Sequence, residues 1–381
     1  MKHLTKITLS IVFAAVLFGC GSNDDNASIW NDEVFIAKLQ SIIDQKVGGD
    51  ADKLVGVSVS IRQGSEEKLS LTGGLSKLGE PINSNMRFGV GSITKTAVAA
   101  TILKLEEEGT LSIHDKISQW IDLTNENIDP DITIAQLLQH FSGVRDYFMN
   151  ENVWPTVMSN LFQPLEPMEI VNFIGEPVFP RGRRWEYSNS NYILLGLIIE
   201  SASGQSVGEA MRSRLWDPLQ LDHIYFADDE SPTGPLAVPW RDGNRDGVLT
   251  DITEEYGAGY HSIFWTAADV FSTASDLSAW AYHMLAGDAL SQTSRRKMLE
   301  FVDLPDPVAT GYGLGLRRVV LAGRSMWGHT GGMRGYGAYM FYDQLSGVSI
   351  VILNNQSLST DGPQLRYELV TEILTEVFAA L

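Results

Sequence analysis

The sequence predicts an α/β fold of the α+β type, in which both ends of the chain build one antiparallel sheet around an inserted, mostly helical domain. Segments with strand patterning lie near both ends, at residues 54–61, 68–71, 313–320, 336–342 and 348–353. The long middle part is mostly helical by pattern, with loops rich in Pro, Asp, Asn and Gly. Amphipathic helical patterns precede the first strand and follow the last one.

The N-terminal elements follow from local periodicity. Apolar side chains recur at helical spacing over residues 31–47, and Asn31 or Asp32 is expected to be the N-cap. Residues 54–61 alternate and are rich in β-branched side chains, which indicates a strand. Residues 68–71 are expected to form a second strand beside it, after a short turn.

The C-terminal elements complete the sheet and define the expected domains. A turn at residues 343–347 joins the last two strands, and the closing helix begins at about residue 364. The sheet domain is therefore expected to comprise residues 29–94 and 260–381, and the helical domain residues 95–259. A catalytic site at the seam would draw residues from both parts.

The first residues differ in character from the rest of the chain. Two lysines, an apolar run over residues 7–19 and then Cys20 give residues 1–19 the pattern of a signal peptide that is too short to span a bilayer. Cys20 follows Leu-Phe-Gly and resembles a bacterial lipobox, so we expect a lipid on Cys20 and a tether over residues 20–28. This predicts a lipid-anchored protein of the bacterial cell envelope, exposed outside the cytoplasm. An ordinary secretory signal with an incidental cysteine is the alternative.

Composition limits the class of partner. With 44% hydrophobic and 20% charged residues the chain has an ordinary globular composition, and its net charge of −19 argues against a nucleic-acid partner. No histidine has metal-ligand spacing. Residues 242–247 resemble the start of a calcium loop, but Thr253 stands where a glutamate is required, which favours a polar turn. No metal or cofactor is expected.

Three Ser-x-x-Lys tetrads begin at Ser65, Ser92 and Ser294. Ser65 lies between two predicted strands, and Ser294 lies in a charged stretch that is typical of a solvated helix face. Ser92 opens an apolar helical run, where unpaired N–H groups and the helix dipole favour a developing oxyanion. Lys95 shares its face and can activate the serine if burial lowers the lysine pKa. The alternative is an N-cap serine beside a surface lysine.

A second candidate segment is Tyr187-Ser188-Asn189, which precedes a buried apolar run. Nearby cations can lower the pKa of a phenol enough for it to relay a proton, and Asn189 could hold a substrate amide. A segment that caps the following helix is the alternative, and both interpretations can hold together.

A third candidate is His329-Thr330-Gly331, followed by Gly332, on or beside a predicted strand. The edge of such a strand offers backbone N–H groups to a carbonyl oxygen, and the glycines permit close approach. A glycine-rich hairpin is the alternative.

These three motifs, in this order, resemble the serine penicillin-recognising superfamily, whose class A signature is Ser-x-x-Lys with Ser-Asp-Asn and Lys-Thr-Gly. The Tyr-Ser-Asn and His-Thr-Gly variants are similar to class C β-lactamases, D-alanyl-D-alanine carboxypeptidases and related esterases. Residues 132–143 and 311–316 also match, so the resemblance covers roughly residues 50–355. It implies the β-lactamase/transpeptidase-like fold.

The resemblance also implies roles for individual residues. Ser92 would be the nucleophile, Lys95 and Tyr187 the proton-transfer pair, and Asn189 a contact to substrate and to Lys95. The remaining implied roles are an oxyanion hole from the N–H groups of Ser92 and Gly332, a substrate border from His329 and Thr330, and a structural role for His140. Most class C β-lactamases have Lys where His329 stands, which puts peptidase and esterase activity ahead of antibiotic hydrolysis.

The sequence therefore predicts a serine hydrolase with an acyl-Ser92 intermediate, most closely a D-alanyl-D-alanine carboxypeptidase-like peptidase or an esterase that takes a small-molecule or peptide acyl substrate. Arg317 and Arg318 lie on an expected strand, so only one can face the cleft. The resemblance implies that Arg317 binds the substrate carboxylate, and two solvated charges are the alternative. A class C-type β-lactamase and a non-catalytic cell-wall peptide-binding lipoprotein remain alternative functions.

Overall fold

A computed structural model describes residues 28–48, 53–232, 234–244, 246–357 and 362–381. The predicted signal peptide and Cys20 lie outside the described residues. Among the helices of the described part, none is both long and apolar enough to cross a membrane.

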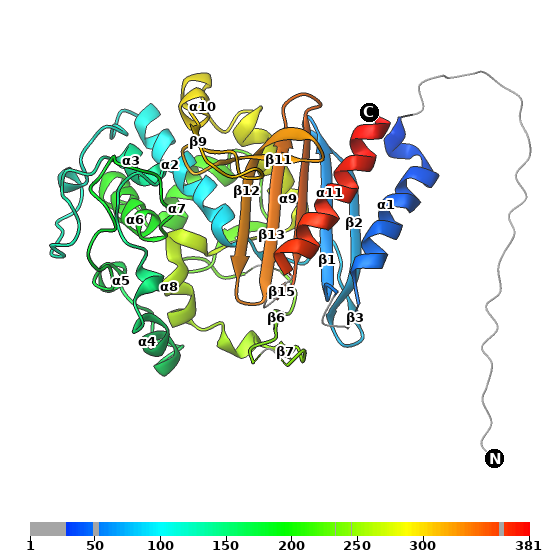
Figure 1. The fold of residues 1–381 in the computed structure, drawn as a ribbon, viewed down its shortest axis with the longest axis horizontal. Coiled ribbons are helices and arrows are strands. Elements are labelled where there is room, and N and C mark those ends of the chain that lie inside the picture. The colour runs from blue at the N-terminus through cyan, green and yellow to red at the C-terminus, as the bar shows by residue number, and fades with distance from the viewer. Residues whose placement is uncertain (1–27, 49–52, 233, 245, 358–361) are drawn as a thin grey trace, which may run out of the picture.

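The central feature is a nine-stranded antiparallel sheet with the order β3-β2-β1-β14-β13-β12-β11-β10-β9 (Figure 1). The two ends of the chain meet where β1 pairs with β14, in a register that sets Val57 opposite Asn354. The predicted antiparallel sheet from both ends of the chain is thus confirmed. Its strands are β1 Gly56–Gln63, β2 Glu66–Lys77, β3 Glu80–Pro81, β9 Val302–Asp303, β10 Gly311–Tyr312, β11 Arg317–Leu321, β12 Arg324–Met333, β13 Tyr336–Asp343 and β14 Val348–Asn354.

One predicted strand is wrong in its extent. Residues 313–320 do not form a single strand, because a tight turn separates β10 from β11: Gly313 N–H donates to the Leu316 carbonyl, and Gly315 has a positive φ of 70°. The turn sets Tyr312 and Arg317 opposite each other on adjacent strands. Both side chains reach the site described below.

Helices cover both faces of the sheet. In Figure 1, α1 (Glu33–Lys46) and α11 (Gly362–Ala380) lie side by side on one face, and Lys46 forms ion pairs with two glutamates of α11. The helix α9 (Ala274–Leu285) packs on the other face, against β1, β13 and β14. Ile352 accordingly joins the core under α1 and α11, whereas its neighbour Val351 joins the opposite core.

The middle of the chain forms the helical part at the left of Figure 1. Within it α2 and α6 pack together, and both are buried along most of their length. The helices are α2 Thr94–Glu107, α3 Ile134–Leu138, α4 Val153–Ser159, α5 Pro167–Val171, α6 Ser190–Ser203, α7 Val207–Met211, α8 Ala258–Ala268 and α10 Gln292–Met298.

Short elements connect the two parts. Two three-stranded sheets, β4-β8-β5 and β15-β6-β7, lie outside the main sheet. Their strands are β4 Phe88–Gly89, β5 Ile224–Phe226, β6 Trp240–Arg241, β7 Thr250–Asp251, β8 Val270–Ser272 and β15 Gln356–Ser357. The single turns are η1 Ile29–Asn31, η2 Gly91–Ile93, η3 Ile117–Gln119, η4 Tyr147–Met149, η5 Arg212–Trp216 and η6 Thr253–Glu255.

Candidate active site

Ser92 lies in the short turn η2, immediately before α2, rather than in the first turn of the α-helix itself. This turn packs against the end of β12. A Cβ on Gly331 would stand 1.8 Å from the Val90 carbonyl oxygen, and one on Gly91 would stand 2.4 Å from the Gly332 nitrogen. Only glycines allow this approach, which brings Ser92 and Gly332 to the same cleft.

The end of β12 has no strand partner on its β11 side within the described sheet. Within the described sheet, β11 pairs with β12 from Arg324 to Gly328, whereas the segment from His329 to Met333 pairs with β13. Backbone groups on the other edge of this segment are therefore available to an extended ligand. The predicted strand edge is present, and it belongs to a ten-residue strand rather than to a bare glycine-rich hairpin.

Lys95 is fully buried and lies at the centre of the site. Its ammonium donates to Ser92 Oγ at 3.2 Å, Asn189 Oδ1 at 2.8 Å and the Ala267 carbonyl at 2.7 Å. Burial lowers the lysine pKa to about 7, because it removes the charged form from water; the Asp146 carboxylate opposes this shift and the Arg317 charge adds to it. Lys95 is therefore not the surface cation of the alternative interpretation.

Asp146 orients the asparagine that contacts Lys95. Its Oδ2 accepts from the backbone N–H of Asn189 at 3.0 Å and from the Asn189 amide nitrogen at 2.8 Å, which turns the amide oxygen toward the lysine. Asp146 lies outside the three sequence motifs. Its only local signal is that of a cap, since Oδ1 accepts from the N–H of Phe148 at the start of η4.

Tyr187 packs beside the same lysine, with Lys95 Nζ 5.0 Å from the centre of its ring. Its buried hydroxyl has no hydrogen-bond partner of normal geometry among the described residues, although it lies close enough to Ser92 and Arg317 for both to lower its pKa. Burial outweighs these effects and raises the pKa of Tyr187 to about 12. The expectation that cations lower this pKa below its normal value is wrong, because burial of a phenolate costs more than they supply.

A chain of hydrogen bonds crosses the seam behind the site. His140 Nδ1 accepts from the Ser188 N–H, so its Nε2 donates to the Tyr312 hydroxyl at 3.1 Å. Tyr312 then donates to His329 Nε2 at 3.2 Å, and His329 Nδ1 donates to the Thr330 carbonyl. Burial, together with the Lys95 and Arg317 charges, lowers the pKa of both histidines well below the usual value.

These contacts assign the two histidines to the framework of the site. His140 has a structural position, as the resemblance implied. The side chain of His329 is 1% exposed and cannot border a substrate, which corrects that expectation. Thr330 is half-buried at the open edge of β12. Tyr312, which lies in the matching segment over residues 311–316, joins the two histidines.

Arg317 is the arginine that faces the site, as strand alternation requires of one member of the pair. Its guanidinium lies 5.3 Å from the ring centre of Tyr187 and 5.8 Å from that of Tyr312, and it forms no ion pair with a carboxylate of the described residues. Arg318 points away and pairs with Asp303.

The other two Ser-x-x-Lys tetrads are engaged elsewhere. Ser65 is exposed in the turn between β1 and β2, and Lys68 pairs with Glu66. Ser294 is 3% exposed on α10, so the predicted solvated face is wrong at this position. Its N–H and hydroxyl bond to Ser291, the N-cap of α10, which accounts for its burial.

The described residues of the segment 242–247, all except residue 245, have the contacts of a polar turn. The Asp242 carboxylate accepts from the backbone N–H groups of Asp246 at 3.2 Å and Gly247 at 3.0 Å. Backbone donors thus occupy the carboxylate, as the sequence interpretation of this segment expected.

A family model described as Beta-lactamase matches residues 39–375. The chain belongs to the beta-lactamase family. It is 27% identical to "Penicillin-binding protein 4*" of Bacillus subtilis over 77% of this chain and 66% of that protein. It is 24% identical to "Esterase EstB" of Burkholderia gladioli over 84% of this chain and 90% of that protein. The chain spans about half to two thirds of the length of the curated relatives that it matches first.

The fold of this beta-lactamase family member also matches solved structures. A D-stereospecific amidohydrolase from Streptomyces sp. superposes with a TM-score of 0.75 at 27% identity, over 87% of this chain and 97% of that one. The predicted fold class and the resemblance to the serine penicillin-recognising superfamily are confirmed.

Proposed function

We propose that the chain is a serine hydrolase that forms an acyl-Ser92 intermediate and acts on peptide or amide bonds. The observation that carries this proposal is the hydrogen bond between Ser92 Oγ and a buried lysine whose pKa is about 7. A lysine of this kind is a free amine in a large fraction of molecules at neutral pH, which a surface lysine is not. It is therefore matched to general-base work.

The geometry supports the following sequence of proton transfers. The Lys95 amine removes the proton from Ser92 as Oγ bonds to the substrate carbonyl carbon, and the N–H groups of Ser92 and Gly332 donate to the oxygen that becomes negative. Tyr187, still protonated, donates its proton to the leaving nitrogen, and Lys95 returns a proton to Tyr187. Water then attacks the acyl ester and gives a proton to Lys95, which returns it to Ser92 Oγ as the bond between Oγ and the acyl carbon breaks.

We propose a peptidase or amidase that accepts D-residues, because similarity to a penicillin-binding protein and to a D-stereospecific amidohydrolase supports this class. Arg317, which has no acidic partner among the described residues, supplies a binding group for the free carboxylate of a peptide. An esterase is the second candidate, favoured by the similarity to an esterase over 90% of its length. Hydrolysis of β-lactams ranks lower, since His329 stands where most class C β-lactamases have lysine, and burial lowers the pKa of His329 well below the usual value.

Labelling with a fluorophosphonate probe, followed by digestion and mass spectrometry, tests the acyl-enzyme. We expect the probe on Ser92, no labelling or turnover in Ser92→Ala, and unchanged labelling in Ser65→Ala, the exposed serine of a second tetrad. Modification of another residue, or normal turnover by Ser92→Ala, would contradict the proposal. Binding of cell-wall peptides without any labelling would favour the non-catalytic alternative.

We also propose that Cys20 carries a lipid that anchors the enzyme to a membrane of the bacterial envelope. The support is the short apolar run that ends in this single cysteine. The helix α1 begins at Glu33, so the tether between anchor and enzyme would be short.

A further inference from the structure

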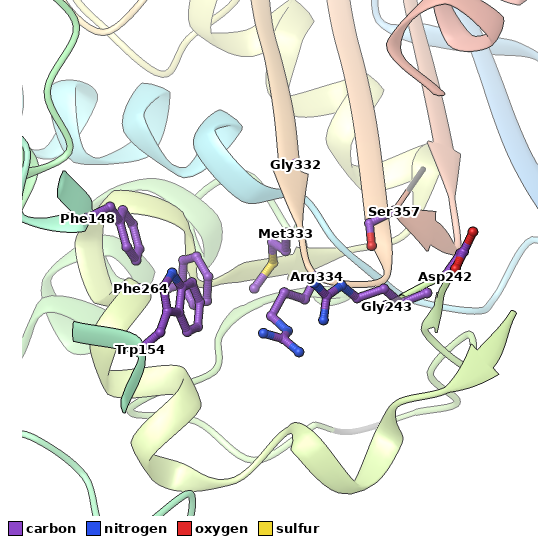
Figure 2. Close-up of a pocket in the computed structure, with 10 residues that line it drawn as sticks. Phe148, Trp154, Asp242, Gly243, Phe264, Gly332, Met333, Arg334 and Ser357 are labelled. Carbon is purple, nitrogen blue, oxygen red and sulfur yellow. The ribbon is translucent and has the colours of Figure 1, made fainter. Parts of the chain in front are cut away.

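A cavity of about 550 Å³ continues the cleft beyond the oxyanion position (Figure 2). Its size falls within the range of small-ligand sites. Gly332 belongs both to the catalytic cleft, where its N–H is a proposed oxyanion donor, and to the lining of the cavity. A Cβ built on Gly332 would meet no atom within 4 Å. The space beside Gly332, where the cleft meets this cavity, is therefore open. The lining residues are Phe148, Trp154, Arg241, Asp242, Gly243, Phe264, Gly332, Met333, Arg334 and Ser357.

One wall of the cavity is aromatic. Phe148 stacks on Trp154 with ring centres 5.6 Å apart, and Phe264 lies 5.4 Å from the first ring and 5.9 Å from the second. Figure 2 shows the three side chains together, with Met333 close to them. Since the rings come from η4, α4 and α8, each is held by a different element. They form a preorganised apolar surface.

Two charged groups that line the cavity are already engaged. The Arg334 guanidinium lies 5.4 Å from the ring centre of Trp154 and forms an ion pair with Glu255, so its charge is compensated. The Asp242 carboxylate accepts backbone hydrogen bonds within its own turn. Arg241 also lines the cavity, in the strand next to that turn. The aromatic wall therefore offers contact area rather than a charge to bind.

Arg317 and the aromatic cavity lie at opposite ends of the cleft along β12. Arg317 is paired with Gly328, and Gly332 lies four residues further on, at a distance of about 13 Å along an extended strand. Met333 and Arg334 lie beyond Gly332. A carboxylate bound by Arg317 thus belongs to the leaving-group side of the scissile bond, and the aromatic cavity to the acyl side.

We infer that the cavity binds the side chain of the acyl residue, and that the preferred residue carries an aromatic or comparably large apolar group. This inference rests on the proposed function, because it takes the scissile carbonyl to lie at Gly332. An acyl residue with a methyl side chain would leave the aromatic wall uncovered and lose that contact area.

The test compares the p-nitrophenyl esters of acetyl-D-phenylalanine and acetyl-D-alanine. Trp154 is half-buried at the end of the wall, so Trp154→Ala removes part of the pocket without opening the core. We expect kcat/KM for the phenylalanine ester to fall about 10-fold to 100-fold, with a change of less than about twofold for the alanine ester. Met149→Ala, an exposed residue beside Phe148 that does not line the cavity, should leave both values unchanged.

The outcomes separate the inference from the proposed function. Suppose that the fluorophosphonate labels Ser92, but Trp154→Ala lowers kcat/KM equally for both esters or changes it for neither. The cavity assignment is then wrong, and the hydrolase assignment stands. If Ser92 is not labelled and neither ester is cleaved, the proposed function fails and the inference fails with it. Calorimetric binding of acetyl-D-phenylalanine amide to Ser92→Ala, weakened about tenfold or more by Trp154→Ala, would support the pocket independently of turnover.

Discussion

At the scale of the single residue, Lys95 shows how burial produces a base. A lysine in water is protonated at neutral pH, because its normal pKa is near 10.4. Enclosure in the core lowers that value to about 7, while Asp146 limits the change and three oxygen acceptors hold the amine in place. The same burial raises the pKa of Tyr187, so the two groups differ in protonation at neutral pH. Burial thus lowers the pKa of Lys95 and raises that of Tyr187, which suits the lysine to the role of base and the tyrosine to the role of acid.

The pH dependence of kcat/KM should report Lys95. Because the amine is the active form, activity is lost as the lysine becomes protonated, about tenfold for each pH unit below about 7. Tyr187 stays protonated up to about pH 12 and adds no limb near neutrality. Asp146→Asn removes the charge that raises the lysine pKa, so the acid limb should move to lower pH. A limb that stays in place in this variant would show that another group titrates.

Arg317 leads to a prediction about substrate class. Arg317→Gln should raise KM about tenfold or more for peptides with a free C-terminal carboxylate, because the guanidinium is the proposed partner of that carboxylate. Neutral aryl esters should retain nearly the same KM. Arg318→Gln is the matched control, since Arg318 is bound to Asp303 and points away from the site. Equal losses on both substrates would dismiss the carboxylate role.

At the scale of the element, the site depends on how closely η2 approaches β12. Neither element is unusual by itself: one is a single turn and the other a strand of a regular antiparallel ladder. The approach is possible because glycines face each other, with Gly91 at a φ of +56° and Gly331 directly against the Val90 carbonyl. The proposed oxyanion hole is therefore a property of the contact between the two elements.

A methyl group at this contact should be costly. Gly331→Ala would place a Cβ 1.8 Å from the Val90 carbonyl oxygen, so one backbone must move. We expect the melting temperature of this variant to fall by several degrees, because overpacking of this kind lowers the free energy of unfolding by about 1–3 kcal/mol. Gly332→Ala is the control for stability, because its Cβ would meet no atom within 4 Å. Equal melting temperatures for both variants would contradict this account of the contact.

At the scale of the whole molecule, the proposed catalytic and substrate-binding residues come from both parts of the chain. Ser92 lies just before α2, the first helix of the middle part, and Lys95 lies in the first turn of that helix. Asn189 directly precedes α6, and Arg317 begins the strand β11 of the main sheet. The bonds that join them span long separations: Lys95 and the Ala267 carbonyl are 172 residues apart. Folding of both parts must therefore be complete before the site exists.

The proposed anchor makes a prediction at this same scale. Cys20→Ser should convert a membrane-bound enzyme into a soluble exported one, because the lipid on the thiol would be its hydrophobic anchor. Fractionation of expressing cells and intact mass measurement would show the change, and kcat/KM should stay the same. Wild-type protein that fractionates as soluble, without added lipid mass, would disprove the anchor.

Local patterns predicted strands at both ends of the chain and the helices that flank them. They also marked the tetrad at Ser92 and the segment from Tyr187 to Asn189, whose catalytic roles come from the family resemblance and stay predictions. Strand and helix periodicity reports which face of an element is buried, and a motif of three or four residues keeps its spacing in any fold. The strand predicted over residues 313–320 was wrong because small and apolar residues alternate over residues 313–316 as they do in a strand, whereas the structure has a tight turn there.

Only the tertiary structure decided the chemistry of those residues. Asp146 meets Asn189 from 43 positions away, and Tyr312 reaches one histidine from each part of the chain. The pKa values of Lys95 and Tyr187 depend on how much water is excluded around them, and no sequence pattern encodes that exclusion. The sequence by itself determined which groups are present and how each segment folds. Their distances, burial and charge states arise from contacts between distant segments, which exist only once the chain is packed.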